Sequence, residues 1–388
     1  MSDSAITITV VGTGHDIDAT PVSVHLDSTF ETTPTTMTEL QSGRTVPCQL
    51  GADDLGSVLT WIERVLRAGE SRRYRLYTSS PPPVDLGDRV ELVEGSDRLD
   101  VLFDSELFTS YRLGGDGAHR PYFHPVLGPH GEQVTRSFPM VTGVPGETTD
   151  HPHHRGIWSA HGAVNSVDNW LEADGAGYTI HCGFQTLNYG PVYGRAVAVA
   201  DWLTSDRETV LLRETRDMSF YDLGQSRIID VDLTLTAGNV DVLFGDTKEA
   251  GTIALRVAST IDEVRGGRVE NAEGAVGEAD VFGRRSPWCD YSGPVSGRTV
   301  GVALFDHDEN FRHPTNWHAR DYGLLGANPF GRSVYEGPDH NGDHKLPARK
   351  SLKFKHRVYI HEGDATEARV AERFRDYVDP PRTHVEQR

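Results

Sequence analysis

Residues 227–235 read Arg227-Ile228-Ile229-Asp230-Val231-Asp232-Leu233-Thr234-Leu235, and apolar and polar side chains alternate along this run. Because successive side chains of a β-strand point to opposite faces of a sheet, the pattern predicts a strand with one buried face. The following Ala237-Gly238-Asn239 predicts a hairpin turn into a further strand at 240–244. Similar short runs bounded by turn residues continue to residue 360, in a chain with 40 glycines and 21 prolines. We therefore predict an all-β fold dominated by a large antiparallel β-sandwich.

The first 80 residues predict a separate, small β-sandwich. Residues 5–11 alternate apolar side chains with threonine, and residues 55–68, whose apolar spacing also suits a short helix, favour a strand. The clearest linker of the chain is Ser79-Ser80-Pro81-Pro82-Pro83. We therefore place an N-terminal β module at residues 1–80 and the main sandwich domain, which carries the predicted active site, at 81–388.

One helix is expected near the C-terminus, at residues 364–377. Its apolar side would be formed by Ala365, Ala368, Val370, Ala371, Phe374 and Tyr377, and it would end before Pro380-Pro381. No internal repeat of 20–50 residues is visible, so a propeller or solenoid is disfavoured.

Charge and cysteine content argue against several classes of function. With 38 Lys and Arg against 57 Asp and Glu, the formal net charge is −19, which disfavours binding to nucleic acid or anionic membranes. Cys48, Cys182 and Cys289 are far apart and odd in number, so neither a disulfide framework nor a structural zinc site is expected. The sequence shows no signal peptide and no run that approaches 18 apolar residues. We therefore expect a cytoplasmic protein without a membrane-spanning segment.

The stretch richest in chemistry reads Asp150-His151-Pro152-His153-His154-Arg155-Gly156-Ile157-Trp158-Ser159-Ala160-His161. Pro152 disfavours a helix and biases the residue before it towards extended geometry. On an extended chain His151, His153 and Arg155 would share one side, and His154 would take the other. Packing so many titratable groups together costs desolvation and mutual repulsion, and folding alone does not require it. We therefore predict that this stretch is the functional centre.

Four later segments also combine acid–base groups with aromatic rings, at residues 246–249, 286–291, 313–320 and 328–332. Sugar sites need this mixture, because a pyranose stacks its apolar face on a ring while its hydroxyls need directional partners. The residues that we expect to transfer protons are His153, His154, His161, Glu249 and Asp290. Those that we expect to bind substrate are His124, His151, Arg155, Trp158, Trp288, Trp317, His318, Arg320 and Asn328.

Three roles remain open for the histidines of the central stretch. The first is acid–base catalysis and hydroxyl binding, with Arg155 and a carboxylate polarising the site. The second is a divalent metal site, because His-x-His on an extended chain presents two imidazoles on one face; the candidate ligands are His151, His153, His313 and His318. The third is structural, with rings bonded to backbone carbonyls. No cofactor is certain, and a divalent metal is the one candidate.

Several of these motifs together resemble the recurring signatures of one bacterial family. They are Arg120-Pro121-Tyr122-Phe123-His124-Pro125, the 150–161 stretch, 245–249, 288–294, 313–320 and 328–331. Over about residues 100–360 the chain resembles a family of unknown function that is often labelled methane oxygenase PmoA-like. The resemblance implies carbohydrate catabolism, because members often accompany sugar dehydrogenases and sugar isomerase-like proteins. The expected sandwich is also similar in outline to galactose-mutarotase-like folds, which use His and Glu on an open sheet.

We therefore expect a carbohydrate-active enzyme that cleaves or isomerises a glycoside or keto-sugar, of the glycoside hydrolase, lyase or epimerase type. Arg155 and Arg320 would polarise a carbonyl or hold an anionic group, and the tryptophans would stack on the sugar. One alternative is a metal-dependent oxidoreductase or hydrolase with histidine ligands. Another is a non-catalytic sugar-binding protein. The expected partner is a small-molecule carbohydrate, and a homo-oligomer stays open.

Overall fold

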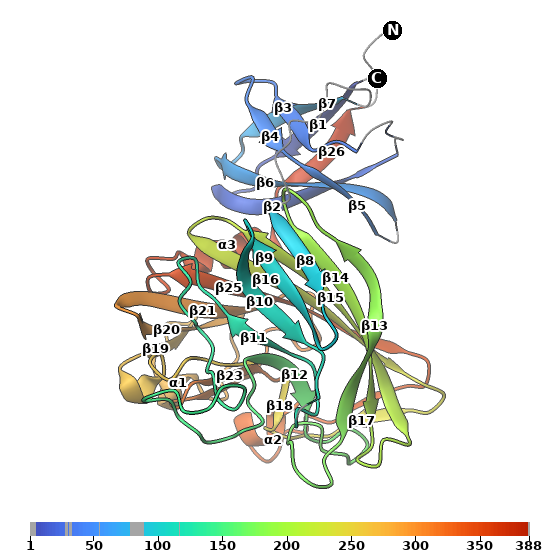
Figure 1. Ribbon diagram of the computed structural model, residues 1–388, viewed down its shortest axis with the longest axis vertical. Helices are drawn as coiled ribbons and strands as arrows, with labels where there is room; N and C mark the ends of the chain where they lie inside the picture. The colour runs from blue at the N-terminus through green and yellow to red at the C-terminus, as the bar shows by residue number, and fades with distance from the viewer. Residues whose placement is uncertain are drawn as a thin grey trace.

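The computed structural model describes residues 5–27, 30, 33–53, 55–77, 89–115 and 117–386, and it is built almost entirely of strands (Figure 1). Two eight-stranded sheets form a large antiparallel sandwich, and a five-stranded and a three-stranded sheet form a small one. The predicted fold, with its small N-terminal β module and its C-terminal helix, is confirmed. Among the described residues, no helix is long and apolar enough to cross a membrane.

The first large sheet has the strand order β22-β23-β18-β12-β11-β10-β9-β8, and the second has the order β13-β14-β15-β16-β25-β21-β20-β19. The strands of the first are β8 (Val90–Glu94), β9 (Arg98–Phe103), β10 (Glu106–Arg112), β11 (Tyr122–Val126), β12 (Ile157–His161), β18 (Ala250–Arg256), β22 (Trp317–Arg320) and β23 (Leu324–Ala327). Those of the second are β13 (Tyr178–Asn188), β14 (Gly194–Leu203), β15 (Val210–Asp222), β16 (Ser226–Ala237), β19 (Arg268–Asn271), β20 (Trp288–Val295), β21 (Arg298–Asp306) and β25 (Ser351–Glu362). Three helical turns lie in the connections, η1 (Glu263–Arg265), α1 (Glu278–Val281) and α2 (Arg332–Tyr335).

Alternation along the strands decides which side chains fill the space between the two large sheets. In β16, Ile229 and Val231 join the main core, and Leu233 and Leu235 join a second apolar cluster. Burial of such side chains is the main favourable term of folding, at roughly 25 cal/mol per Å² of apolar surface. β16 lies between β15 and β25 in the middle of its sheet.

The predicted hairpin after residue 237 is wrong. Because β15 and β25 already occupy both sides of β16, no edge remains for the following segment. That segment forms β17 (Val242–Phe244), which pairs instead with β24 (His344–Leu346), with Val242 opposite Leu346.

The small sandwich is completed by the end of the chain. Its five-stranded sheet has the order β26-β1-β7-β3-β4, and β26 (Arg382–Glu386) pairs with β1 so that Glu386 lies opposite Thr7. The remaining strands are β1 (Ala5–Val11), β2 (Ile17–Leu26), β3 (Thr36–Glu39), β4 (Thr45–Pro47), β5 (Gln49–Asp53), β6 (Gly56–Leu66) and β7 (Ser71–Tyr77). Residues 55–68 are thus largely strand, as favoured. The linker predicted at 79–83 lies outside the described residues, and we propose the division near residue 80 with β26 added to the N-terminal module.

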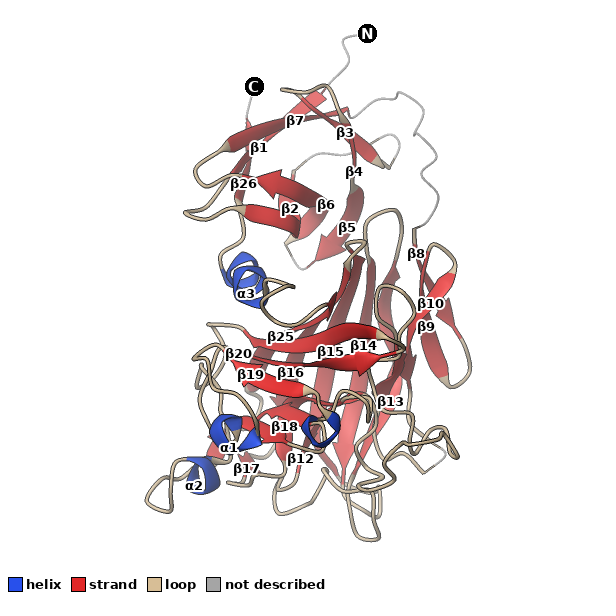
Figure 2. Ribbon diagram, turned by 90° about the vertical axis from the view of Figure 1, so that its left-hand side faces the viewer, coloured by secondary structure: helices blue, strands red, loops and turns tan. Residues whose placement is uncertain are grey.

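The C-terminal helix begins later than predicted. α3 spans Val370–Val378, and the preceding residues form turns that end at Arg369 with φ +56°, in the left-handed region that a continuous helix does not allow. Its buried side includes Arg373 and Asp376, whereas Ala371 is exposed. Asp376 is buried because its carboxylate pairs with Arg373 at 3.2 Å and accepts a hydrogen bond from Thr20 at 3.1 Å. Figure 2 shows α3 between the small sandwich and the second large sheet.

Gln49 of the small sandwich joins it to the large one. Its Oε1 accepts hydrogen bonds from the backbone N–H groups of Val192 and Tyr193, at 3.1 Å each. Its Nε2 donates to Asn188 Oδ1 at 2.9 Å and to the Tyr193 carbonyl at 3.1 Å. A single amide side chain thus satisfies a buried stretch of backbone across the junction.

Candidate functional site

A row of side chains crosses the outer face of the first large sheet, which is turned away from the main core. Across β12, β18, β23 and β22, Trp158 pairs with Ala254, Ala254 with Gly326, and Gly326 with His318. The two small residues leave room between the two rings, and Trp170 fills it, with centroids 5.6 Å from Trp158 and 6.2 Å from His318. All three rings are buried. We call Trp158, Trp170 and His318 the aromatic floor.

Two buried arginines hold the histidine loop, residues 150–154, through its backbone. Arg136 donates hydrogen bonds to the carbonyl oxygens of Asp150 and His151, at 2.8 Å each. Arg120 donates to the carbonyl oxygen of His153 at 3.1 Å. Because the donors are rigid, charged forks, these bonds are strong and leave the loop little freedom.

The predicted extended geometry of this loop is wrong. The His154 N–H donates to the His151 carbonyl at 3.0 Å, which closes a turn, and His151 has φ +43°. As a result, the rings of His151 and His154 stack, with centroids 4.9 Å apart and planes at 7°, rather than pointing to opposite sides. A non-glycine residue in this backbone region is strained, and such strain concentrates at functional sites.

Asp150 and His151 form a partly exposed carboxylate–imidazole pair. His151 Nδ1 lies 2.5 Å from Asp150 Oδ2, while Asp150 Oδ1 accepts hydrogen bonds from Arg136 at 2.9 Å and Arg256 at 2.8 Å. Burial raises the pKa of Asp150, but the hydrogen bond from His151 and the charge of Arg256 outweigh it and hold this pKa well below its usual range. The side chains of His151 and Asp150 are 42% and 37% exposed. Since Nδ1 of His151 serves the carboxylate, Nε2 is the ring nitrogen left for a substrate.

Two further imidazoles of the loop are kept uncharged. Burial, followed by the charge of Arg120, lowers the pKa of His153 to about 3. Burial, followed by the neighbouring His153, lowers the pKa of His154 well below its usual value. The His154 ring stacks on Trp158 with centroids 5.3 Å apart, and His153 is only partly buried. At neutral pH each neutral ring can donate one hydrogen bond to a hydroxyl group and accept another, but both rings are weak bases.

On the β11 side of the floor, Glu172 bridges two arginines. Its Oε2 lies 2.7 Å from Arg155 Nε, and its Oε1 lies 3.3 Å from Arg120 Nη1. The Arg155 guanidinium also lies 5.7 Å from the centroid of the Tyr122 ring. His124 stands on the same face of β11 as Tyr122, and burial lowers its pKa to about 4.

On the β22 side, partly exposed charged groups surround Tyr322. Its ring stacks on His151 with centroids 4.9 Å apart, and the Arg320 guanidinium lies 5.4 Å from its centroid. Lys248 Nζ lies 3.1 Å from Glu249 Oε1. We call the exposed or partly exposed groups above the aromatic floor the polar shelf: Asp150, His151, His153, Lys248, Glu249, Arg320 and Tyr322.

The structure brings most of the predicted site residues to this one face. They are His124, His151, His153, His154, Arg155, Trp158, Glu249, His318 and Arg320. Six other predicted residues lie elsewhere or are engaged in structural contacts: His161, Trp288, Asp290, His313, Trp317 and Asn328.

His161 and Trp317 point into the sandwich instead of towards the shelf. His161 follows Trp158 by three positions in β12, so its side chain leaves the opposite face of the sheet. Its buried ring packs against Phe244, with centroids 5.4 Å apart, and against Phe330, at 4.9 Å, and these two rings also contact each other at 5.3 Å. Trp317 belongs to the main core. Proton transfer by His161 at the shelf therefore has no geometric support.

Asp290 and Trp288 lie on β20, in the second large sheet. Asp290 is fully buried, and its Oδ1 lies 2.8 Å from His361 Nε2. Trp288 packs with Phe305 in an apolar cluster of that sheet. The sandwich core therefore separates both residues from the histidine loop.

Asn328 and His313 make local contacts. Asn328 is buried, and its Nδ2 donates to the Thr247 carbonyl at 2.9 Å, so it shapes the loop that carries Lys248. His313 Nδ1 lies 2.8 Å from Asp306 Oδ2, at the end of β21. Within the described ranges, no group of three or more His, Cys, Asp or Glu side chains is arranged to hold a metal ion. The four predicted metal ligands thus do not form one site.

Sequence reasoning missed several residues that build this face, namely Arg120, Arg136, Trp170, Glu172, Arg256 and Tyr322. Arg256 ends β18, whose seven residues are all buried, and only the pairing of β18 with β12 shows that Arg256 leaves the outer face. Trp170 did carry a signal, since it follows the histidine stretch by nine positions in a chain with 6 tryptophans.

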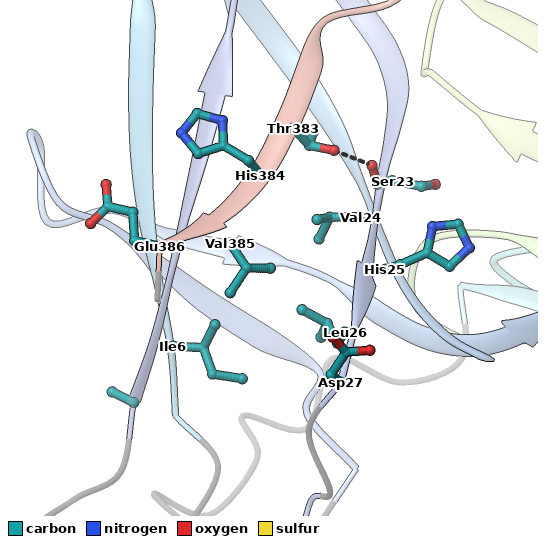
Figure 3. Close-up of a pocket in the computed structure, with 11 residues that line it drawn as sticks. Ile6, Ser23, Val24, His25, Leu26, Asp27, Thr383, His384, Val385 and Glu386 are labelled. Atoms are coloured by element: carbon teal, nitrogen blue, oxygen red, sulfur yellow. Dashed lines mark hydrogen bonds between the residues drawn. The ribbon is translucent and has the colours of Figure 1, made fainter. Parts of the chain in front are cut away.

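Two hollows in the described surface lie away from this face. One, of about 720 Å³, opens at the edge of the small sandwich between β2 and β26, where Val24, Leu26 and Val385 form its apolar part (Figure 3). Another, of about 750 Å³, lies where the small sandwich meets β25 and the turns before α3. Neither contains a residue of the polar shelf.

Comparison with known proteins gives a family but no activity. A family model described as "Family of unknown function (DUF6807)" matches residues 98–375. No curated protein matches the chain. Among solved structures, a protein in the glycosyl hydrolase family 38 from Enterococcus faecalis is similar with a TM-score of 0.47 at 9% identity, covering 99% of this chain and 48% of that one. An alpha-mannosidase from Enterococcus faecalis V583 gives a TM-score of 0.43 at 10% identity, with 99% and 46% covered.

A galactose mutarotase related enzyme from Lactobacillus acidophilus is similar with a TM-score of 0.25 at 8% identity, covering 70% of this chain and 97% of that one. The chain spans about half the length of the two Enterococcus structures. All three TM-scores are below 0.5, so the function of the site must be judged from its own geometry.

Proposed function

This chain belongs to the DUF6807 family of unknown function, and we propose that it is an enzyme that acts on a carbohydrate by proton transfer at the polar shelf. The proposal places the enzyme in the cytoplasm, with a small-molecule glycoside or keto-sugar as its substrate. Nothing in the match to residues 98–375 refers to methane oxidation, and no observation on the shelf favours it.

The observation that carries this proposal is the Asp150–His151 pair. A carboxylate bonded to Nδ1 of an imidazole orients the ring and stabilises its protonated form, so that Nε2 can accept and return a proton. Arg136 and Arg256 hold the carboxylate in place, and the loop backbone is held as well. The proton-transfer role therefore moves from His153, His154 and His161 to His151.

The surroundings of this pair suit a sugar. His153 supplies a neutral ring that can bond to hydroxyls, while Glu249, Lys248 and Arg320 add charged donors and acceptors at the rim of the shelf. The partly exposed Tyr322 ring, which stacks on His151, adds an aromatic surface beside the pair for the apolar face of a pyranose. A metal-dependent reaction has less support, because His313 is engaged with Asp306 away from the shelf.

The test compares two pair variants with a matched control. The full chain is incubated with a panel of glycosides, free sugars and keto-sugars, and any conversion is followed by NMR. His151→Gln should lower kcat about 100-fold or more, as general acid–base groups contribute roughly 10²–10⁴. Asp150→Asn should do the same, because it presents the wrong hydrogen-bonding partner to Nδ1.

The control is His25→Gln, which alters another exposed carboxylate–imidazole pair, with Asp53 3.0 Å away in the small sandwich. It should turn over like the wild type. Wild-type turnover in both His151→Gln and Asp150→Asn would refute the proposal. Binding of a sugar with no chemical change in any panel member would instead support a non-catalytic sugar-binding protein.

A further inference from the structure

Positive charge is concentrated beneath the polar shelf, in a chain whose formal net charge is −19. Four arginine side chains are buried there, and within the described residues their ion pairs involve two carboxylates. Asp150 pairs with Arg136 and Arg256, and Glu172 pairs with Arg120 and Arg155. Each carboxylate thus serves two guanidinium groups.

Two further carboxylates near this face bond to backbone N–H groups instead of to these guanidinium groups, and their charges act on Arg136 and Arg120. Glu147 accepts hydrogen bonds from two backbone N–H groups at 2.7 and 2.9 Å, and Asp168 accepts two at 2.7 and 3.0 Å. At the rim, Lys248 pairs one to one with Glu249, and Arg320 Nε lies 3.0 Å from Glu278 Oε1. Guanidinium groups therefore outnumber the carboxylates bonded to them at two places, the histidine loop and Glu172.

The positive charge of this face also affects the pKa values of its imidazoles. Burial is the first cause of the lowered pKa of His124, His153, His154 and His318. After burial, the next largest causes are charged groups of arginine, lysine or another imidazole, and these lower the pKa further.

Unpartnered hydrogen-bond donors add to this polarity. Within the part of the chain that the structure describes, Nε1 of Trp158, Nε1 of Trp170, Nε of Arg120 and Nε of Arg256 are buried and make no hydrogen bond. All four are N–H groups that can only donate. Buried donors without acceptors are costly, and their dipoles favour an electron-rich group nearby.

We infer that the polar shelf stabilises negative charge that develops on a substrate oxygen, and that the enzyme removes a proton from a sugar carbon next to a carbonyl group. This inference rests on the proposed function and selects one reaction class within it. Glycoside hydrolysis would build positive, oxocarbenium-like charge on the ring, which the buried arginines oppose. An enolate builds negative charge, which they favour. The substrates would be keto-sugars or uronic acid derivatives, since both carry an acidic C–H beside a carbonyl.

In the reaction, Nε2 of His151 accepts the proton from that carbon. The C–H electron pair forms a double bond to the carbonyl carbon, and the carbonyl π pair moves to oxygen as the enolate. Solvent water gives a proton to the opposite face of the carbon, His151 passes its proton to the hydroxide that remains, and the epimer results. Departure of an alkoxy group from the β-carbon, with its electron pair and the proton from His151, gives the elimination product instead. Neither course consumes an oxidant or a reductant.

The test follows solvent deuterium into the substrate. The full chain is incubated in D₂O with methyl glucoside, with a keto-glycoside derived from it by ring oxidation, and with a methyl glucuronoside. Proton NMR should show loss of the C–H signal beside the carbonyl of the keto-glycoside or the glucuronoside, with methyl glucoside unchanged. His151→Gln should slow this exchange at least 100-fold, and Arg320→Gln, a surface change, should slow it at least 10-fold. His25→Gln should match the wild type.

The outcomes separate the inference from the proposed function. Hydrolysis of methyl glucoside without deuterium incorporation would overturn the enolate inference and leave the carbohydrate-active enzyme standing. Exchange that is unchanged in His151→Gln and Arg320→Gln would overturn the assignment of the shelf. No change in any of the three compounds counts against both.

Discussion

The buried position of His161 makes a quantitative prediction about stability and pH. Its ring is buried against Phe244 and Phe330, and both ring nitrogens lack partners within the described residues. Burial lowers its pKa from 6.5 to about 3. The folded protein therefore holds this ring neutral, whereas the unfolded chain protonates it below pH 6.5. The contribution of the neutral His161 ring to the free energy of unfolding is therefore present in full above pH 6.5, and it is lost as the pH falls from 6.5 towards 3.

Replacement of His161 with Phe removes this titration. At pH 4.5 the pH lies 2 units below the unfolded pKa of 6.5, and each unit is worth about 1.4 kcal/mol, so the wild type should lose about 3 kcal/mol that His161→Phe keeps. Any packing cost of the larger ring is the same at both pH values, so it cancels in the difference.

Urea unfolding followed by circular dichroism at pH 7.5 and 4.5 measures this difference. The stability of His161→Phe relative to the wild type should rise by about 3 kcal/mol between the two pH values. A constant difference, within about 0.5 kcal/mol, would show that the ring is accessible or partnered and would refute its placement inside the sandwich.

Three further changes test the framework of the site and the junction. Gly156→Ala would place a Cβ 1.9 Å from the Phe123 carbonyl oxygen at a position with φ +52°; it should cost at least about 3 kcal/mol in thermal unfolding or prevent folding, whereas a normal Tm would show that the loop is loose. Gln49→Ala leaves two buried N–H groups of residues 192 and 193 without acceptors and should cost about 2–4 kcal/mol in urea unfolding, whereas unchanged stability would contradict this role of Gln49. Deletion of residues 382–386 uncovers the edge of β1 and should produce self-association in light scattering; a monomer of unchanged Tm would contradict a structural role for β26.

The sequence determined the strands and the presence of a cluster of titratable groups, because both depend on residues that are neighbours in the chain. Alternation at 227–235 predicted β16, since the period of a strand needs only neighbouring residues. The density of titratable groups at 150–161 marked the histidine loop for the same reason. The turn residues at 237–239 predicted a hairpin that does not form, because the following strand β17 pairs with β24, about 100 residues later.

Only the tertiary structure decided which of these groups face one another. Trp158 and His161 are three residues apart, and the pairing of β12 between β11 and β18 places one on the outer face and the other in the core. The same pairing carries Arg256 to the carboxylate of Asp150, over a separation of 106 residues. Sequence patterns report side-chain periodicity along one strand, whereas a site depends on strand order and register, which arise from hydrogen bonds between distant segments.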